Sequence, residues 1–426
     1  MSEGHPPAEK KTESPRATNQ KEPTPDQGQC HGEGGDVDRS ELGRRSKAAP
    51  GDQKYTKRDC ADEGGPTNPS AGRSRERWGA EHCLRVQWLV MVESQGLRRT
   101  VVVTGGAGFI GVHTVEALLA EGHRVVVLDD LRHASTRPLD PVAELIEIDI
   151  TTPAARERIA AARPDCILHL AAQGGVNRSW RDPVADAEAN VLGTVNVLMA
   201  AEAIGCRRVV LASSGGALYG RTDVLPTPET HPASPRSPYG TAKVAAEGYL
   251  QMYSRIRGLA GLALRYGNVY GPGQDGSGEA GVVAITCHRL LDGRPPVVRG
   301  DGGQTRDFVF VRDVAQANVR ALATDAGAAV NVGTGRETSV REVLDGLTGL
   351  ATFGGRLEAA ALPDGEVPRS CLDTNRAREV LGWEAATSLG EGLELTWDHF
   401  RSVGTTEAQR HQSRLRHHEA TRAAGA

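Results

Sequence analysis

Apolar runs of strand length alternate with helical patterns from Thr100 onward. Each run is separated from the next by a helix-length stretch or a shorter connection, which is typical of buried parallel strands joined by crossover segments. The runs occupy residues 101–103, 125–128, 144–148, 166–170 and 208–212. This rhythm predicts an α/β fold built on a doubly wound, parallel Rossmann sheet.

The second half of the chain is interrupted by stretches rich in glycine and proline, but it still contains helical patterns. Helices are predicted near residues 280–292, 313–323 and 339–349. We expect a Rossmann domain over residues 99–266, to which residues 301–333 return. Residues 267–300 and 334–403 are expected to form a smaller C-terminal α/β domain that binds the substrate.

The two ends of the chain show little apolar periodicity. Residues 1–98 are rich in Gly, Pro, Ser and charged residues, and such a segment cannot bury enough apolar surface to offset its ordering entropy. We predict a disordered extension there and a flexible tail at 404–426. The extension is either a regulatory or docking segment or a dispensable one. Met91 would be an ordinary start for the folded part of the chain, which favours the dispensable interpretation.

Charge and cysteine usage exclude several function classes. A formal net charge of −4 leaves no basic excess to neutralise phosphates, so we expect no nucleic-acid partner. The seven cysteines form no C-x-x-C pair, which favours reduced thiols in the cytoplasm and no metal. No apolar run approaches the roughly 20 residues that a membrane helix needs, and no membrane partner is expected.

A glycine-rich loop, Thr104-Gly-Gly-Ala-Gly-Phe-Ile-Gly111, joins the first predicted strand to a helix. Gly105 permits a tight turn, Gly108 lets the backbone approach a pyrophosphate, and Gly111 lets the helix pack close to the strand. The alternative is an ordinary glycine-rich turn. The order of strand, loop and helix favours dinucleotide binding.

Asp129 ends the next predicted strand, about 20 residues after the loop. Its carboxylate would accept hydrogen bonds from ribose hydroxyls and repel a 2′-phosphate, which favours NAD over NADP. Arg132 lies close enough in sequence to leave NADP as an alternative.

Tyr239 and Lys243 are four residues apart, in Tyr239-Gly-Thr-Ala-Lys243. On a helix they share one face, and an ammonium close to a phenol favours the phenolate. A phenol becomes a usable base near neutral pH only with such help. By itself this spacing would describe a surface pair, but here it follows a dinucleotide loop and the Ser213-Ser214 turn.

Together these motifs resemble the extended short-chain dehydrogenase/reductase family, especially its NAD-dependent epimerase/dehydratase members. The resemblance spans about three hundred residues and includes His169-Leu-Ala-Ala-Gln173, Asn190-Val-Leu-Gly-Thr194 and Asn331-Val-Gly-Thr-Gly335. It implies an NAD-dependent enzyme acting on a nucleotide sugar. The implied catalytic residues are Tyr239, Lys243 and Ser214. The implied cofactor contacts are Gly105, Gly108, Phe109, Ile110, Gly111, Asp129, Asp149, Ile150, Leu170, Ala171, Ala172, Asn190, Tyr239, Lys243 and Tyr266.

The turn after the fifth apolar run, 208–212, departs from the family pattern. Relatives place a Ser or Thr hydroxyl where this chain has Gly215, so Ser214 is the nearest substitute and Ser213 the alternative. Dehydratase relatives carry an Asp-Glu pair where this chain has Gly216 and Ala217. The resemblance therefore implies epimerisation at C4 of UDP-glucose or UDP-galactose, with Tyr239 as base and a transient 4-keto intermediate. Other nucleotide-sugar enzymes of the family (a dehydratase, decarboxylase or ketoreductase) and a non-catalytic NAD-binding scaffold are the alternatives.

Substrate binding and assembly are also implied by the resemblance. Ser214, Asn268 and Arg306 would contact the nucleotide sugar, the last two at its diphosphate. The alternative for Arg306 is an ion pair with Asp307 or Asp313. An Arg common in relatives is missing at 362–366, which leaves the nucleotide open. A homodimer through helices at 184–205 and 239–256 is implied as well.

Overall fold

The computed structural model describes residues 98–276, 281–363 and 366–404. The extension and the tail predicted at the two ends lie outside these ranges, apart from residues 98 and 404. The centre of the described part is a seven-stranded parallel sheet in the order β11-β6-β5-β4-β1-β2-β3. Its strands are β1 (Thr100–Thr104), β2 (Arg124–Asp129), β3 (Glu144–Glu147), β4 (Cys166–His169), β5 (Arg208–Ser214), β6 (Ala260–Tyr266) and β11 (Ala328–Val332).

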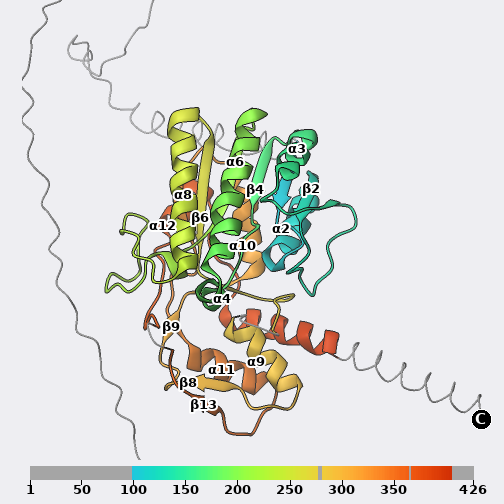
Figure 1. The fold of residues 1–426 in the computed structure, drawn as a ribbon. Helices are drawn as coiled ribbons and strands as arrows, with labels where there is room; N and C mark the ends of the chain where they lie inside the picture. The colour runs from blue at the N-terminus through green and yellow to red at the C-terminus, as the bar shows by residue number, and fades with distance from the viewer. Residues whose placement is uncertain (1–97, 277–280, 364–365, 405–426) are drawn as a thin grey trace, which may run out of the picture. The chain divides into compact units, whose positions relative to one another are not determined.

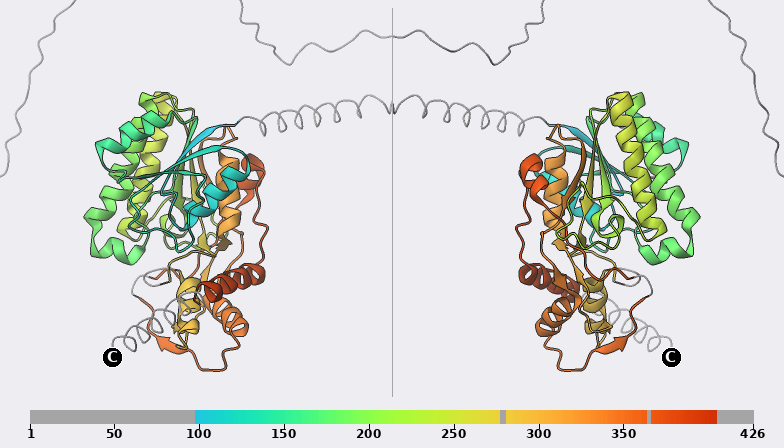
Figure 2. Two further views of the ribbon diagram at one scale, coloured as in Figure 1. Left: turned by 90° about the vertical axis from the view of Figure 1, so that its right-hand side faces the viewer. Right: turned by 90° about the vertical axis from the view of Figure 1, so that its left-hand side faces the viewer.

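Helices cover both faces of this sheet (Figures 1 and 2). On one face lie α2 (Phe109–Ala120), α10 (Val311–Ala321) and α12 (Asn375–Leu381), and on the other α3 (Pro153–Ala162), α6 (Gly193–Ala203) and α8 (Pro238–Arg257). Strand side chains alternate between the two cores, so Val101 and Val103 face one and Val102 the other. This arrangement confirms the predicted Rossmann fold class.

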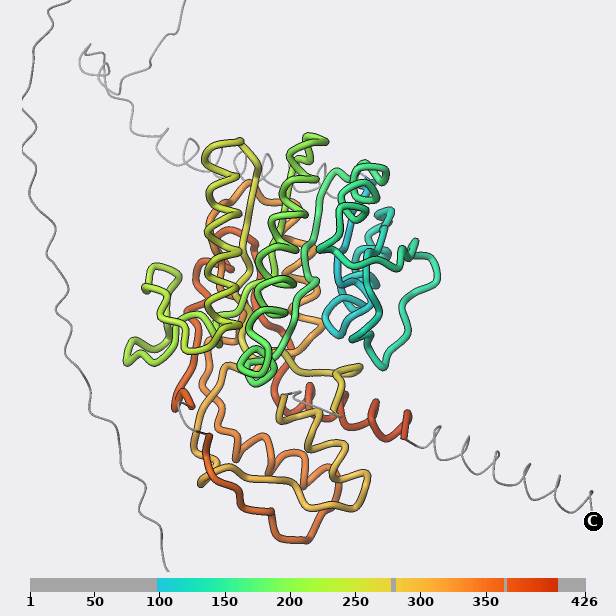
Figure 3. Tube along the Cα trace, viewed as in Figure 1, coloured from blue at the N-terminus to red at the C-terminus, as the bar shows by residue number. Residues whose placement is uncertain are grey.

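A smaller α/β body lies beyond the carboxyl ends of the strands (Figure 1). Its helices include α9 (Val282–Leu291), α11 (Val340–Leu350) and a helix over residues 389–404, and its short strands are β8 (Val297–Arg299), β9 (Thr305–Arg306), β12 (Thr338–Ser339) and β13 (Glu358–Ala360). Between the bodies β7 (Asn268–Tyr270) pairs with β10 (Phe308–Phe310). The trace passes from the smaller body back to the sheet through α10 and β11 (Figure 3). The exact domain boundaries stay predictions.

The helix expected over 184–205 is divided. Residues 183–203 form α5 (Pro183–Ala187), a π-helical turn η1 (Glu188–Leu192) and α6. A π turn widens the backbone for a few residues and is frequent at functional sites. Here it carries the buried Asn190, whose amide donates to the Gln173 carbonyl. Within the described residues no helix combines the length and apolarity needed to cross a bilayer.

A buried ion pair joins α8 to the sheet. Glu247 is 3% exposed and Arg265 is 8% exposed, and Arg265 Nη2 lies 2.7 Å from Glu247 Oε2. Ser213 Oγ donates to the same carboxylate at 2.6 Å, and Arg265 Nη1 donates to the Tyr219 hydroxyl at 2.9 Å. Because both charges are matched by fixed donors and acceptors, the pair holds α8 against β5 and β6.

We predict that Arg265→Met lowers the free energy of unfolding by about 3–5 kcal/mol, because it leaves Glu247 buried without a counter-charge. The control is Arg124→Met, which breaks an exposed pair with Glu144 and should cost less than about 1 kcal/mol. Denaturant unfolding of both variants provides the measurement. Equal losses would show that burial of the first pair does not matter.

Candidate active site

The glycine loop between β1 and α2 leaves a backbone cradle with no room for side chains. Gly105 has φ +69°, and a Cβ there would lie 2.5 Å from the Ala171 nitrogen. A Cβ on Gly111 would lie 2.2 Å from the Gly105 oxygen. Gly108 caps α2 without a side-chain hydrogen bond, so the first amides of the helix remain available to an anion. The cradle fits the pyrophosphate of a dinucleotide.

Asp129 stands at the end of β2 beside this loop. It is 8% exposed, and its carboxylate accepts hydrogen bonds from the Ala107 nitrogen at 3.0 Å and the Leu131 nitrogen at 2.9 Å. Burial raises its pKa, while the two backbone N–H groups oppose the shift. Arg132 is engaged elsewhere: Nε lies 2.6 Å from Asp130 Oδ2 and Nη2 lies 2.7 Å from Asp149 Oδ2. This pairing favours Asp129 over Arg132 as the group that meets the ribose.

The other predicted cofactor residues surround the same end of the sheet. Leu170 to Ala172 follow β4 and pass beneath Gly105. Ile150 is buried, and its carbonyl accepts from Asn196 at 2.6 Å. The Tyr266 hydroxyl donates to Asn318 Oδ1 at 2.6 Å. Phe109 and Ile110 begin α2. Roles in cofactor binding stay predictions for all of them.

His169 and Asn190 are held inside the protein. His169 is 1% exposed, between Thr104 Oγ1 at 2.7 Å and Thr194 Oγ1 at 3.0 Å. Asn190 donates to the Gln173 carbonyl at 3.2 Å and to an Asp186 carboxylate oxygen at 3.0 Å. His169 is therefore a core residue of the sheet.

Tyr239 and Lys243 lie in the first turns of α8, whose N-cap is Ser237. Lys243 is 3% exposed, its Nζ donates to the Ala212 carbonyl at 3.0 Å, and Nζ lies 5.8 Å from the centre of the Tyr239 ring. The Ser214 hydroxyl is near enough to the Tyr239 phenol to lower its pKa as a hydrogen-bonding neighbour. The structure therefore brings the three predicted catalytic side chains together at the carboxyl end of β5.

Burial moves both pKa values in this group. It raises the pKa of Tyr239 to about 12, although the Ser214 hydrogen bond acts in the opposite direction. It lowers the pKa of Lys243 to about 8, which still leaves the ammonium protonated at neutral pH. Further positive charge beside the phenol would favour its ionised form. Lys243 is also the only lysine of the sequence after residue 57.

Packing explains the missing hydroxyl at position 215. A Cβ on Gly215 would lie 2.6 Å from Leu372 Cδ2, so Leu372 takes the space that a side chain would need. Leu372 is 1% exposed, and its nitrogen donates to Asp307 Oδ2 at 3.2 Å. Nothing in the local sequence indicated this contact, because Leu372 belongs to a distant segment.

The predicted substrate residues lie on the side of the smaller body. Asn268 begins β7, and a Cβ on Gly216 would lie 3.2 Å from Asn268 Oδ1, which places the Asn268 amide beside the turn at 215–218. Arg306 Nη2 forms an ion pair with Glu366. Burial lowers the pKa of Arg306, and Glu366 opposes this shift.

The proposed alternative partners of Arg306 were wrong. Asp307 accepts backbone N–H groups from Thr334 at 2.7 Å and Leu372 at 3.2 Å, and Asp313 accepts from the Thr387 nitrogen at 3.0 Å. Both carboxylates are thus committed to backbone donors. The actual partner lies in the loop before Arg369, where sequence spacing gives no signal of proximity.

Comparison with known proteins agrees with this geometry. The model of the NAD dependent epimerase/dehydratase family matches residues 101–333. The chain belongs to this family. It is 45% identical over 307 residues to the UDP-glucose 4-epimerase of Mycolicibacterium smegmatis, covering 71% of this chain and 98% of that protein.

Two solved structures are similar over the same share of the chain. A UDP-glucose 4-epimerase of Thermotoga maritima with UDP-glucose is 42% identical, with a TM-score of 0.70, over 71% of this chain and 99% of that one. The Thermus thermophilus UDP-glucose 4-epimerase in complex with NAD is 42% identical, with a TM-score of 0.67 and the same coverage. The predictions of an extended short-chain dehydrogenase enzyme and of NAD as its cofactor are confirmed.

We predict that Gly215→Ser destabilises the protein by about 1–3 kcal/mol, because the added side chain overpacks against Leu372. Adding Leu372→Ala should recover part of this loss, giving a favourable coupling of about 0.5–3 kcal/mol in a double-mutant cycle measured by denaturant unfolding. Gly349→Ser is the control, since a Cβ at Gly349 meets nothing within 4 Å. Purely additive effects would mean that the two positions do not compete for space.

Proposed function

We propose that this enzyme epimerises a nucleotide sugar at C4 and interconverts UDP-glucose and UDP-galactose with retained NAD. The observation that carries the proposal is the group formed by Tyr239, Ser214 and Lys243 at the carboxyl end of β5, beside the glycine cradle. The names of the relatives, UDP-glucose 4-epimerases at 42–45% identity, support the same reaction.

The chemistry supplied by bound NAD is reversible hydride transfer at the sugar carbon. Gly105, Gly108, Gly111 and Asp129 would hold the dinucleotide. Tyr239 would take the proton of the C4 hydroxyl as the 4-keto sugar forms. After the sugar has rotated so that its opposite face meets the cofactor, Tyr239 would return the proton to the C4 oxygen. The Ser214 hydroxyl positions the sugar oxygen beside the phenol.

Two features disfavour the other reactions of the family. The turn at 215–218 has no acidic side chain that could protonate a leaving hydroxyl, and the Asn268 amide leaves little space for one at Gly216. A ketoreductase needs exchangeable NADPH, but Asp129 borders the cradle while Arg132 is paired with Asp130 and Asp149. Epimerisation requires neither an acidic side chain in this turn nor exchangeable NADPH.

For the nucleotide, Asn268 and Arg306 are the proposed diphosphate contacts. A guanidinium suits a diphosphate because it presents fixed, parallel donors. Arg306 would have to exchange its ion pair with Glu366 for the phosphate oxygens when the substrate binds.

We predict that the purified protein interconverts UDP-galactose and UDP-glucose without added NAD. Tyr239→Phe should lower kcat by about 10²–10⁴-fold, because it removes the base. The measurement is chromatographic separation of the two sugars, and the control is Tyr253→Phe on the same helix. Turnover of GDP- or dTDP-sugars in place of UDP-sugars would overturn the assignment of UDP as the nucleotide. Full activity of Tyr239→Phe would refute the mechanism.

We also propose a homodimer in which α5, η1, α6 and α8 pack against their copies. These elements carry several exposed apolar side chains, which is frequent where a surface is covered by another subunit. The side chains are Val184, Leu192, Met199, Tyr249 and Ile256, which are 41–66% exposed. A cytoplasmic location is proposed as well, since the four described cysteines are free thiols.

We predict that Leu192→Glu combined with Ile256→Glu converts the dimer to a monomer, because the two carboxylates would be buried without partners in the interface. The molar mass in solution, measured by light scattering, should fall by half. Val142→Glu is the control, since Val142 is 77% exposed but lies before β3. A mass of one chain for the unmodified protein would contradict the proposal.

A further inference from the structure

A buried carboxylate without a cationic partner lies close to the proposed catalytic residues. Asp186 in α5 is 1% exposed. Its Oδ1 accepts hydrogen bonds from Gln173 Nε2 and from Asn190 Nδ2, each at 3.0 Å, and its Oδ2 has no hydrogen-bond partner within the part of the chain that the structure describes. Both donors are neutral amides. A buried carboxylate held in this way is costly unless a positive charge lies nearby.

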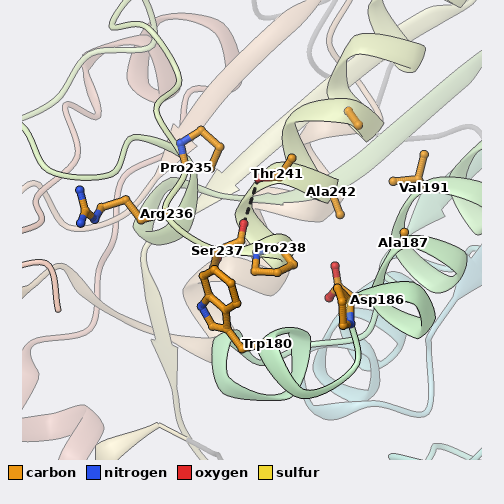
Figure 4. A pocket seen from close by; sticks show the side chains of 12 residues that line it. Trp180, Asp186, Ala187, Val191, Pro235, Arg236, Ser237, Pro238, Thr241 and Ala242 are labelled. Carbon is orange, nitrogen blue, oxygen red and sulfur yellow. Dashed lines mark hydrogen bonds between the residues drawn. The ribbon is translucent and has the colours of Figure 1, made fainter. Parts of the chain in front are cut away.

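Asp186 faces the start of α8. It lies in the wall of a pocket of about 670 Å³ between α4 (Val176–Arg181), α5 and the N-terminal turns of α8. Pro238, Thr241 and Ala242 of α8 line the same pocket, opposite Asp186 in Figure 4. Lys243 follows directly in the sequence. Burial raises the pKa of Asp186, while the Asn190 hydrogen bond and the charge of Lys243 oppose that shift, and Asp186 in turn raises the pKa of Lys243.

The other groups around Lys243 do not supply a free negative charge. Glu247, one turn further along α8, is neutralised by Arg265 at 2.7 Å. His169 on β4 is uncharged, since burial and the nearby Lys243 lower its pKa to about 3. Tyr239 on α8 and Tyr266 on β6 are phenols whose pKa burial raises. Among the described groups that act on Lys243, Asp186 is therefore the carboxylate with no cation of its own.

We propose that Asp186 is a positioning residue, the buried counter-charge that keeps the Lys243 ammonium protonated beside Tyr239. It also holds Gln173, four residues after β4, and Asn190, in the π turn, through their amides. The inference rests on the roles proposed above for Tyr239 and Lys243.

The direction of the electrostatic effect follows from the sign of the charge. A carboxylate favours the protonated form of both neighbours, so Asp186 raises the pKa of Lys243 against the effect of burial and also raises that of Tyr239. Replacing it with a neutral side chain of equal size lowers both pKa values. The activity profile therefore moves as a whole toward lower pH.

The first test measures Lys243 itself and does not depend on activity. The lysines are labelled selectively for NMR in the full chain. The six lysines other than Lys243 all lie at or before residue 57. The Lys243 resonance is identified because it is absent from the spectrum of Lys243→Arg. Asp186→Asn should lower the pKa of Lys243 by about one unit or more. Gln173→Leu, which removes a hydrogen bond to Asp186 but keeps its carboxylate, should leave the pKa of Lys243 unchanged. An unchanged pKa in Asp186→Asn overturns the proposal.

The second test is the pH dependence of kcat/KM with UDP-galactose. Asp186→Asn should shift both limbs of the profile to lower pH, whereas Asp186→Glu should restore the original position. Loss of activity at every pH without a shift would mean a structural role only and would overturn the proposal. If Asp186→Asn does not fold, as judged by its melting temperature, Asp186→Ser takes its place in both tests. Absence of activity in the unmodified protein would count against the proposed function, while the NMR result would still decide the role of Asp186.

Discussion

The Lys243 ammonium is the group around which the site is arranged, because it must stay charged while almost entirely removed from water. Within the described residues, its Nζ donates a hydrogen bond to the carbonyl of Ala212 in β5, two residues before Ser214 ends that strand. Desolvation lowers its pKa to about 8. A small further loss of negative charge nearby would bring that pKa to neutrality, and the ammonium would then fail to favour the phenolate of Tyr239.

The carboxyl ends of β4 and β5 supply the surroundings that this charge requires. The π turn brings Asn190, and α5 just before it brings Asp186, into contact with Gln173 in the segment that follows β4. A regular helix through 188–192 would rotate these side chains relative to one another, since the π turn contains extra backbone per turn. The widened turn and the uncommon buried carboxylate are thus parts of one arrangement.

Much of the fold and part of the site could be predicted from the sequence. Strands, glycine loop and the Tyr239/Lys243 pair depend on residues close together in the chain, so periodicity and spacing are sufficient to find them. The contact of Gly215 with Leu372, and the ion pair of Arg306 with Glu366, join segments that only the folded chain brings together. The sequence does not predict a role for Asp186, because a single acidic residue in a helical pattern normally indicates an exposed surface. Its significance comes from its burial, which the sequence does not reveal.

The distribution of arginine and lysine reflects the same physical distinction. Fixed charges of the framework are arginines: Arg265 pairs with Glu247, and Arg208, 4% exposed, donates to the carbonyls of Ala321 and Ala326 at 2.9 and 2.8 Å. A guanidinium stays protonated when buried and spreads its charge over several donors, which suits a permanent contact. An ammonium is a compact charge whose pKa responds to burial and to neighbouring carboxylates. After residue 57 the chain has this responsive cation at position 243 alone, where a pKa close to the working pH requires a nearby carboxylate to control it.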